Sequence, residues 1–154
     1  PAHELGGQAG VASLAADGDA HVVFVHFEEN GAAALVDPDI PRLGRADGFF
    51  EQLERQARAL CAGIERIAAA HEIPVRAGSA GSMWGFFFRS EPVRSFADAK
   101  SSRIDLFQRF FHAALERGVY LAPSAFEAGF LSSAHTDEDI EATLAAARRV
   151  FARL

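Results

Sequence analysis

One carboxylate lies inside an otherwise apolar segment in the second half of the chain. The segment YLAPSAFEAGF, residues 120–130, has Glu127 as its single charged residue, together with two phenylalanines, a tyrosine, three alanines and a leucine. A carboxylate in such surroundings is costly unless it is paired or hydrogen-bonded, and arginine forms the strongest pairs with it. This pattern is compatible with a site that uses Glu127. A local alternative stays open, because Ser124-x-x-Glu127 is also a capping-box pattern for one helical turn.

Few other residues could form a covalent bond with a substrate or cofactor. Lys100 is the only lysine, against fourteen arginines, and it lies in the polar segment FADAKSS. A lysine that forms a Schiff base needs an apolar environment to lower its pKa, so we predict that Lys100 is a solvated surface residue. Cys61 lies beside the apolar stripe of a predicted helix, and we interpret it as a small core residue rather than a catalytic thiol.

Two further patterns give only weak signals for ligand binding. The glycines at positions 78, 81 and 85 could cradle a phosphate, but they lead into a predicted strand, without a Walker lysine or a helix N-terminus after them. His21, His26 and Glu28 could bind a metal, but strand alternation places the two histidines on opposite faces. The sequence therefore favours neither a phosphate loop nor a metal site.

The length and composition indicate an ordinary globular protein. A chain of 154 residues favours one domain with a sizeable core. The net charge is −6 and the arginines are scattered, so nucleic-acid binding is disfavoured. No apolar run reaches the roughly 20 residues of a membrane span. The single cysteine excludes an internal disulfide and fits a reducing cytoplasm.

The first 45 residues are predicted as a separate, unassigned segment. Residues 21–28, HVVFVHFE, have the β-branched and aromatic composition of a strand. The dipeptide Asn30-Gly31 suits a type I′ turn. We therefore predict a hairpin over residues 21–37, after which Pro38 and Pro41 interrupt regular structure.

Three helices are predicted in residues 46–154 from apolar residues spaced three and four apart. The first runs over residues 47–72 with Asp47 as N-cap, the second over residues 104–116 with Gly118 as its stop, and the third follows a Thr136 N-cap with Asp139 completing a capping box. Their predicted buried stripes are Phe50, Leu53, Ala57, Leu60, Ile64 and Ile67; then Ile104, Phe107, Phe111 and Leu115; and finally Ile140, Leu144, Ala147 and Phe151.

Short strands are predicted between these helices. They are EIPV at 72–75, the apolar run at 83–88, VYLAPS at 119–124 and FLSSAH at 130–135. The run at 83–88 suits either a strand covered on both faces or a strand with one face in the core and the other at an interface. The order of elements predicts an α+β fold, a small antiparallel or mixed sheet of three to four strands with the helices packed on one side. Residues 46–154 would form this domain.

Three segments of that domain carry a resemblance to a known family. They are AGSMWGFFF, VRSFADAK and LFQRFFHAALERGVYLAPSAFEAGFLSSAHTDEDIEATLAAARR. Together they resemble the C-terminal small domain of the glutamate-1-semialdehyde 2,1-aminomutase family, which belongs to the class III, fold-type-I aminotransferases. The resemblance covers residues 46–154 and does not extend to residues 1–45.

The resemblance implies a reaction and a cofactor. Members of the family use pyridoxal 5′-phosphate to convert glutamate-1-semialdehyde into 5-aminolevulinate, a tetrapyrrole precursor, and they act as cytoplasmic homodimers. The Schiff-base lysine and the cofactor site belong to the family's large domain, and no residue here matches them. We therefore expect this chain alone to be inactive, to bind no cofactor, and to need a large domain or companion chain as its partner.

The resemblance also implies roles for a few residues. It places Glu127 at the rim of the active site, where it helps to position the substrate, through an arginine outside this chain. Ser82 could also face the substrate, whereas Met83 and Trp84 are expected to pack in the core or at a domain interface. No catalytic, cofactor-binding or metal-binding residue is expected. Two alternatives stay open: a non-catalytic interaction or dimerisation domain, and a small-molecule binder at the rim.

Overall fold

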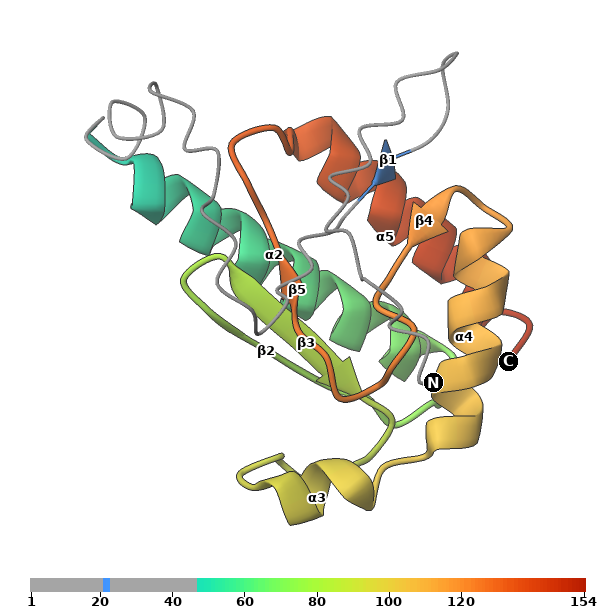
Figure 1. Ribbon diagram of the computed structural model, residues 1–154. Helices are drawn as coiled ribbons and strands as arrows, with labels where there is room; N and C mark the ends of the chain where they lie inside the picture. Colours follow the sequence, from blue (N-terminus) through green and yellow to red (C-terminus); the bar gives the residue numbers. More distant parts are fainter. Residues whose placement is uncertain (1–20, 23–46) are drawn as a thin grey trace, which may run out of the picture.

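The computed structural model describes residues 21–22 and 47–154 (Figure 1). The elements follow the order β1, α2, β2, β3, α3, α4, β4, β5, α5. Strand β1 (His21–Val22) is the only described part of the hairpin predicted for residues 21–37. The rest of that prediction lies outside the described residues.

The long helix α2 (Phe49–Ala70) forms on the predicted apolar stripe and packs along the sheet and along α5. Two details of its start were predicted wrongly. Its N-cap is Gly48, in the left-handed conformation with φ 81°, and not Asp47. Phe50 is exposed, because the first turn of the helix extends beyond the sheet that buries the later stripe residues.

A β-hairpin follows α2, and its second strand lies at the apolar run predicted as a strand, whereas its first strand was not predicted. Strand β2 (Arg76–Ala80) pairs antiparallel with β3 (Met83–Phe87), and Gly81 forms the turn with φ 58°. Gly78 and Gly85 face each other across this pair. The predicted strand at 72–75 is wrong, since the chain is irregular there and the first strand begins at Arg76.

The sheet is completed by β5 (Gly129–Phe130), which pairs antiparallel with β3 to give the order β2-β3-β5. Strand β4 (Val119–Tyr120) lies apart from this sheet and pairs parallel with β1. The predicted strands at 119–124 and 130–135 are therefore too long. Between them, the segment 121–128 runs as irregular chain across the end of the core.

Two helices join the hairpin to β4. The short α3 (Phe96–Lys100), capped by Ser95, was not predicted, because its few residues read as a polar connection. Helix α4 (Ile104–Leu115) has the predicted extent, and Gly118 follows it with φ 77°. Its buried face is rotated from the predicted one. The fully buried side chains are Phe107, Phe110 and Ala114, whereas Phe111 is half-buried and Leu115 is exposed.

The last helix, α5 (Asp137–Phe151), has the predicted cap and the predicted buried stripe. Thr136 Oγ1 accepts a hydrogen bond from Asp139 N at 3.2 Å, and Asp139 Oδ2 accepts one from Thr136 N at 2.8 Å. This reciprocal pair satisfies two backbone donors that the first turn of a helix otherwise leaves unpaired.

Replacing Thr136 by alanine is expected to lower the free energy of unfolding by about 1 kcal/mol, because the cap at Asp139 N is lost. Urea denaturation followed by circular dichroism measures this. Thr136→Ser keeps the hydroxyl and should cost little. Equal losses in the alanine and serine variants would contradict the assigned cap.

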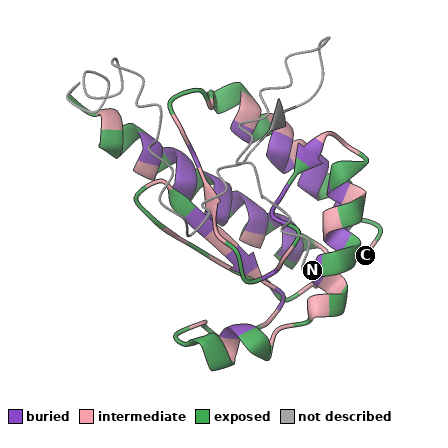
Figure 2. Ribbon diagram, in the orientation of Figure 1, coloured by how far each residue is buried: buried purple, intermediate pink, exposed green. Residues whose placement is uncertain are grey.

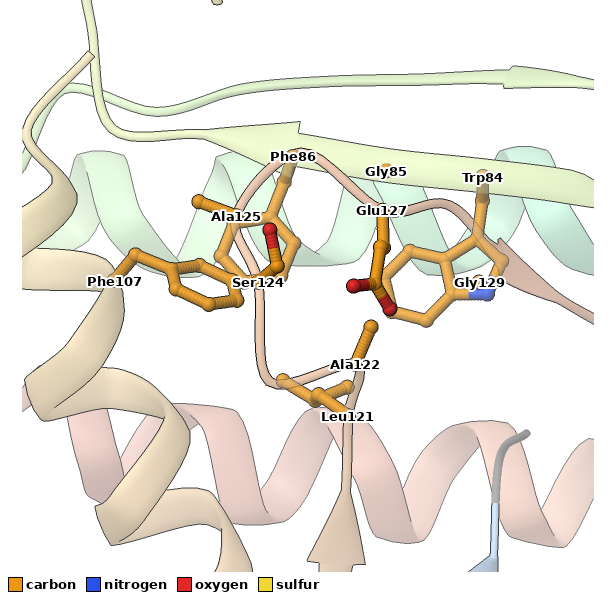
Figure 3. A pocket seen from close by; sticks show the side chains of 10 residues that line it. All are labelled: Trp84, Gly85, Phe86, Phe107, Leu121, Ala122, Ser124, Ala125, Glu127 and Gly129. Atoms are coloured by element: carbon orange, nitrogen blue, oxygen red, sulfur yellow. The ribbon is translucent and has the colours of Figure 1, made fainter. Parts of the chain in front are cut away.

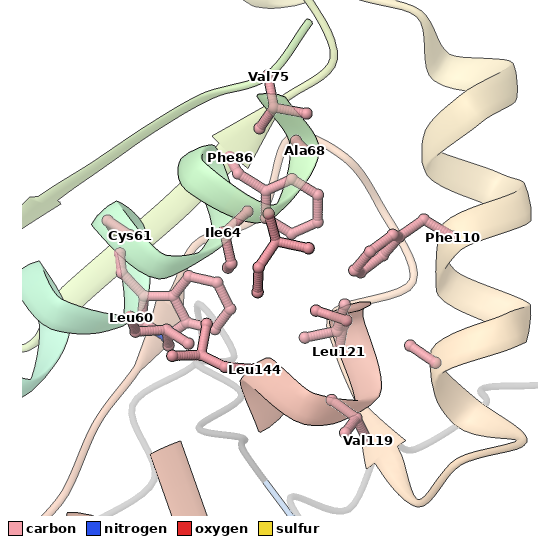
Figure 4. Close-up of a cluster of buried hydrophobic side chains, with 14 of the residues drawn as sticks. Leu60, Cys61, Ile64, Ala68, Val75, Phe86, Phe110, Val119, Leu121 and Leu144 are labelled. Atoms are coloured by element: carbon pink, nitrogen blue, oxygen red, sulfur yellow. The ribbon is translucent and has the colours of Figure 1, made fainter. Parts of the chain in front are cut away.

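The core lies between the inward face of β3 and the helices. Among the described residues of the sheet, only this face is buried. Trp84 and Phe86 of β3 and Phe88, directly after it, alternate along the chain and all point inward, with at most 6% of each residue exposed. Phe86 and Phe88 contact Phe110 of α4, and Phe88 also contacts Phe151 of α5. Figure 4 shows the same cluster with side chains of α2, and Figure 2 shows burial concentrated where the elements meet.

The predicted fold class is confirmed. Helices α2, α4 and α5 all contribute to the core beneath one face of a small antiparallel sheet. Of the two alternatives predicted for residues 83–88, coverage on both faces is wrong, and one face in the core with the other at an interface stays a prediction. On the outer side of β3, Met83 is exposed, and Gly85 and Phe87 are only half-buried.

Candidate functional site

The outer face of the sheet carries an open groove with a volume of about 500 Å³. Strand β2 contributes Arg76 and Gly78, β3 contributes Met83 and Gly85, and the segment before β5 contributes Phe126 and Glu127. The space above the Gly78–Gly85 pair is open, because a Cβ atom added at either glycine would meet nothing within 4 Å. We call this the outer groove.

A second, smaller cavity of about 30 Å³ lies between β3 and the segment 121–129, and we call it the inner cavity (Figure 3). It has room for about one water molecule. Its walls include Trp84, Phe107, Leu121 and Ala125, and Glu127 lines both this cavity and the outer groove. In Figure 3 the Glu127 carboxylate points toward the indole of Trp84. Glu127 therefore stands where the two hollows meet.

A tight turn fixes the backbone of Glu127. Glu127 N donates to Ser124 O at 3.2 Å, and Phe126 N donates to Ser124 Oγ at 3.2 Å. The capping box that the sequence left open does not form, because no side-chain bond from Glu127 reaches back to Ser124 in the described part of the chain. The Glu127 side chain is exposed and forms no ion pair there. A local role as a cap therefore loses its support.

Trp84 forms part of the wall of the inner cavity beside Glu127, and this role was not predicted. The side chain is 4% exposed, and its Nε1 has no hydrogen-bond partner among the described residues. Gly129 lies directly against it: a Cβ added at Gly129 would come within 2.6 Å of Nε1. The glycine in the sequence AFEAGF was the signal for this close approach.

Ser82, the other residue predicted to face the substrate, lies in the hairpin turn. Its carbonyl oxygen accepts a hydrogen bond from Leu131 N at 2.9 Å. Neither hollow is lined by Ser82, so the structure does not bring it together with Glu127. This hydrogen bond ties the hairpin turn to Leu131, the residue directly after β5.

Lys100 lies at the end of α3 and is exposed. Its Nζ stands 5.8 Å from the centroid of the Phe96 ring, which is itself 67% exposed. The Phe96 ring contacts that of Phe126 edge-on, with centroids 5.6 Å apart. The lysine is therefore near the rim but projects into solvent.

Cys61, a further candidate within the described residues, belongs to the core. Cys61 is 6% exposed, as predicted for a core residue, and burial raises the pKa of its thiol. Such a thiol is a poor nucleophile because its thiolate is disfavoured.

Across residues 21–22 and 47–154, no group of three histidine, cysteine or acidic side chains could hold a metal ion. None of the helices in these ranges is long and apolar enough to cross a membrane.

Comparisons with known proteins agree with this geometry, although no family model matches the chain. The glutamate-1-semialdehyde 2,1-aminomutase of Roseiflexus castenholzii is 54% identical over 117 residues, which cover 76% of this chain and 26% of that enzyme. The aminomutase of Nitrosomonas europaea is 48% identical over 104 residues, 68% of this chain and 24% of the enzyme. A solved glutamate-1-semialdehyde aminomutase from Pseudomonas aeruginosa PAO1, in complex with PMP, superimposes with a TM-score of 0.60 at 21% identity, over 67% of this chain and 23% of that one.

The fold is thus the one found in class III pyridoxal-phosphate aminotransferases, and the matched region is their C-terminal part. Within this class, the chain is a homologue of glutamate-1-semialdehyde 2,1-aminomutase and resembles its C-terminal part. The chain spans about a quarter of the length of the curated relatives that it matches.

The described residues do not fit pyridoxal phosphate. The single lysine is exposed and has no apolar enclosure, whereas a Schiff-base lysine needs one. The outer groove contains one basic residue, Arg76, whose Nε already donates to Ser90 O at 2.7 Å. We derive no chemical step through the cofactor from these residues.

Proposed function

We propose that residues 46–154 act as the C-terminal small domain of a glutamate-1-semialdehyde 2,1-aminomutase. The observation that carries this proposal is Glu127, a carboxylate that forms no ion pair with residues 21–22 or 47–154 and is held by a turn where the outer groove and the inner cavity meet. Its side chain is exposed, so a guanidinium from another part of the enzyme can reach it and form a charged hydrogen-bonded pair. The sequence identity of 54% to an aminomutase supports the same assignment.

In this proposal, Glu127 forms part of the wall of a substrate site and pairs with an arginine supplied from outside this chain. Its backbone is fixed by the turn at Ser124, and its side chain is exposed, so it can meet a guanidinium without rearrangement of the core. A bidentate guanidinium–carboxylate pair would set the geometry of both groups. Ser82 is proposed only as a second, weaker contact, from the turn of the hairpin.

The activity of the whole enzyme would be the conversion of glutamate-1-semialdehyde to 5-aminolevulinate in tetrapyrrole synthesis, in the cytoplasm and in a homodimer. The cofactor and the lysine that holds it would come from a large domain or companion chain. The exposed position of Lys100 supports this division, because the Phe96 ring beside its ammonium group is itself exposed and does not enclose it. The role of this chain would be to close one side of the site and to exclude water from it.

The 154-residue chain alone is expected not to attach pyridoxal phosphate and not to turn over glutamate-1-semialdehyde. The test is incubation with the cofactor, reduction with borohydride and mass spectrometry of the intact protein. The aminomutase of Roseiflexus castenholzii is the positive control. Cofactor bound to Lys100 in a stoichiometric amount would overturn the proposal that this chain lacks the catalytic half.

A second candidate function is that of a non-catalytic interaction domain. The observation that favours it is the exposure of Phe96 and Phe126, which contact each other at the rim of the outer groove. Apolar side chains grouped around one groove are typical of an interaction surface.

A further inference from the structure

Two fixed points hold the short segment that carries Glu127. Before it, Ser124 accepts two hydrogen bonds, one at its carbonyl oxygen from Glu127 N at 3.2 Å and one at its Oγ from Phe126 N at 3.2 Å. After it, Gly129 pairs with Trp84 of β3 in the sheet. Figure 3 shows this loop beside β3, with Ser124 and Glu127 both lining the inner cavity. The position of Glu127 therefore depends on anchors three residues before it and two residues after it.

The two hydrogen bonds that Ser124 accepts differ in what they need from its side chain. The bond to the carbonyl oxygen can form with any residue at position 124, whereas the bond to Oγ needs a side-chain acceptor such as a hydroxyl. A serine whose Oγ accepts from the N–H two residues further on closes a side-chain turn, which fixes the peptide between Ala125 and Phe126. The hydroxyl is therefore the part of this turn that depends on the amino acid.

Loss of this hydroxyl would affect the local position of the chain more than the stability of the fold. The hydrogen bond from Phe126 N lies at an exposed part of the chain, so water can replace Oγ as the acceptor. Ala125 would stay anchored, because it is 8% exposed and belongs to the core. The peptide after Ala125 would gain freedom to rotate, and Glu127 follows it by one residue.

The Glu127 side chain relies on its backbone for a defined orientation. It is exposed and forms no ion pair with residues 21–22 or 47–154, so it keeps its rotamer freedom until a partner binds. A carboxylate that binds a guanidinium through two parallel hydrogen bonds needs one orientation. Freedom that the backbone has already lost does not have to be removed when the partner and the substrate bind.

We propose that the Ser124 hydroxyl is a positioning group for substrate binding, which holds the backbone so that the Glu127 carboxylate meets its guanidinium partner in one orientation. This inference rests on the proposed function and deepens it, because it names a residue that acts on the substrate only through Glu127. Its loss weakens the binding of the ground state and of the transition state alike. It should therefore raise KM and leave kcat nearly unchanged.

The first test uses an enzyme in which residues 46–154 replace the matching C-terminal part of the Roseiflexus castenholzii aminomutase. Ser124→Ala should raise the KM for glutamate-1-semialdehyde roughly fivefold, the scale of one net hydrogen bond, with kcat within about twofold. Ser124→Thr keeps the hydroxyl and should restore most of the affinity. Ser132→Ala is the matched control, because Ser132 Oγ likewise accepts from the N–H two residues on, Ala134 N at 3.3 Å, but Ser132 lines neither hollow. Its KM should stay that of the parent chimera.

A double-mutant cycle with Glu127→Gln separates positioning from a general structural effect. If Ser124 acts through the carboxylate, Ser124→Ala should lower kcat/KM by less than about twofold in the Glu127→Gln background. A purely structural role would give equal losses in both backgrounds. The absorbance of the bound cofactor and circular dichroism verify that each variant is folded and loaded like the parent.

Exchange of the Phe126 amide hydrogen, measured by nuclear magnetic resonance in the 154-residue chain, tests the turn without any activity. It should be several-fold faster in Ser124→Ala than in the parent chain. An unchanged exchange rate, an unchanged KM, or equal losses in both backgrounds of the cycle would each overturn the inference. In these cases the parent chimera still forms product and the proposed function stands. A parent chimera that forms no product would overturn the proposed function and, with it, the positioning role.

Discussion

Replacing Phe88 by alanine is expected to lower the free energy of unfolding by about 4 kcal/mol. Phe88 is 1% exposed and lies at the centre of the core, where its ring contacts Phe86, Phe110 and Phe151. The substitution removes those ring contacts and leaves a cavity bounded by two helices and a strand, which cannot collapse together without moving one of them. Such a loss is a large part of the roughly 5–15 kcal/mol that stabilises a typical domain.

Urea denaturation measures this loss, as a lower midpoint with an unchanged slope. Phe50→Ala is the control, because that ring is 65% exposed and packs only against Phe49 in the described structure. We expect it to cost less than about 1 kcal/mol. If the two alanine variants lost similar stability, the core assigned to the inward face of β3 would be wrong.

Replacing Gly129 by alanine is expected to cost about 2 kcal/mol and to displace Trp84. The added methyl group would lie 2.6 Å from Nε1 and 2.7 Å from Cε2 of the indole, closer than any real Cβ contact. Gly129 is held by its pairing with Trp84 in the sheet, so the ring must move and not the strand. The wall of the inner cavity therefore changes shape.

Trp84 is the only tryptophan, so its fluorescence reports this displacement directly. We expect the emission of folded Gly129→Ala to shift to longer wavelength. Gly85→Ala is the matched control, since a Cβ at that strand position meets nothing within 4 Å. An unchanged emission spectrum and midpoint in Gly129→Ala would contradict the close packing of β5 on the indole.

Periodicity in the sequence predicted most of the helices, because three of the four described helices bury a continuous apolar stripe. The stripe and the cap of α5 were both right, since Thr136 and Asp139 act locally. The predicted stripe of α4 included Phe111 and Leu115, whereas the buried face of the helix contains Phe110 and Ala114. Both choices satisfy helical spacing, and only the position of β3 decides which face is buried.

The strands were predicted less well, for a physical reason. The hairpin of β2 and β3 contains three glycines, which read as a loop, yet Gly78 and Gly85 form a regular cross-strand pair. Short strands are defined by their partners, and those partners are distant in sequence. The strand pair of Gly129 with Trp84 is an example that no local pattern indicates.

The candidate site was predicted in part. The unusual chemistry of a lone carboxylate in an apolar segment pointed to Glu127, and the structure places it at the meeting of two hollows. The sequence did not indicate that Trp84 would form the wall beside it, nor that Phe96 would reach Phe126. Those contacts arise from the fold of segments 30 to 45 residues apart, which a linear pattern does not contain.

The central claim is that residues 46–154 serve as an aminomutase C-terminal domain that uses Glu127. The direct measurement is turnover of glutamate-1-semialdehyde by a chimera, in which these residues replace the matching C-terminal part of the Roseiflexus castenholzii enzyme. We predict 5-aminolevulinate formation within about tenfold of the parent rate, and a loss of roughly another tenfold in Glu127→Gln, whose side chain cannot form a charged pair. A chimera that is folded and holds its cofactor like the parent, but forms no product, would contradict the claim.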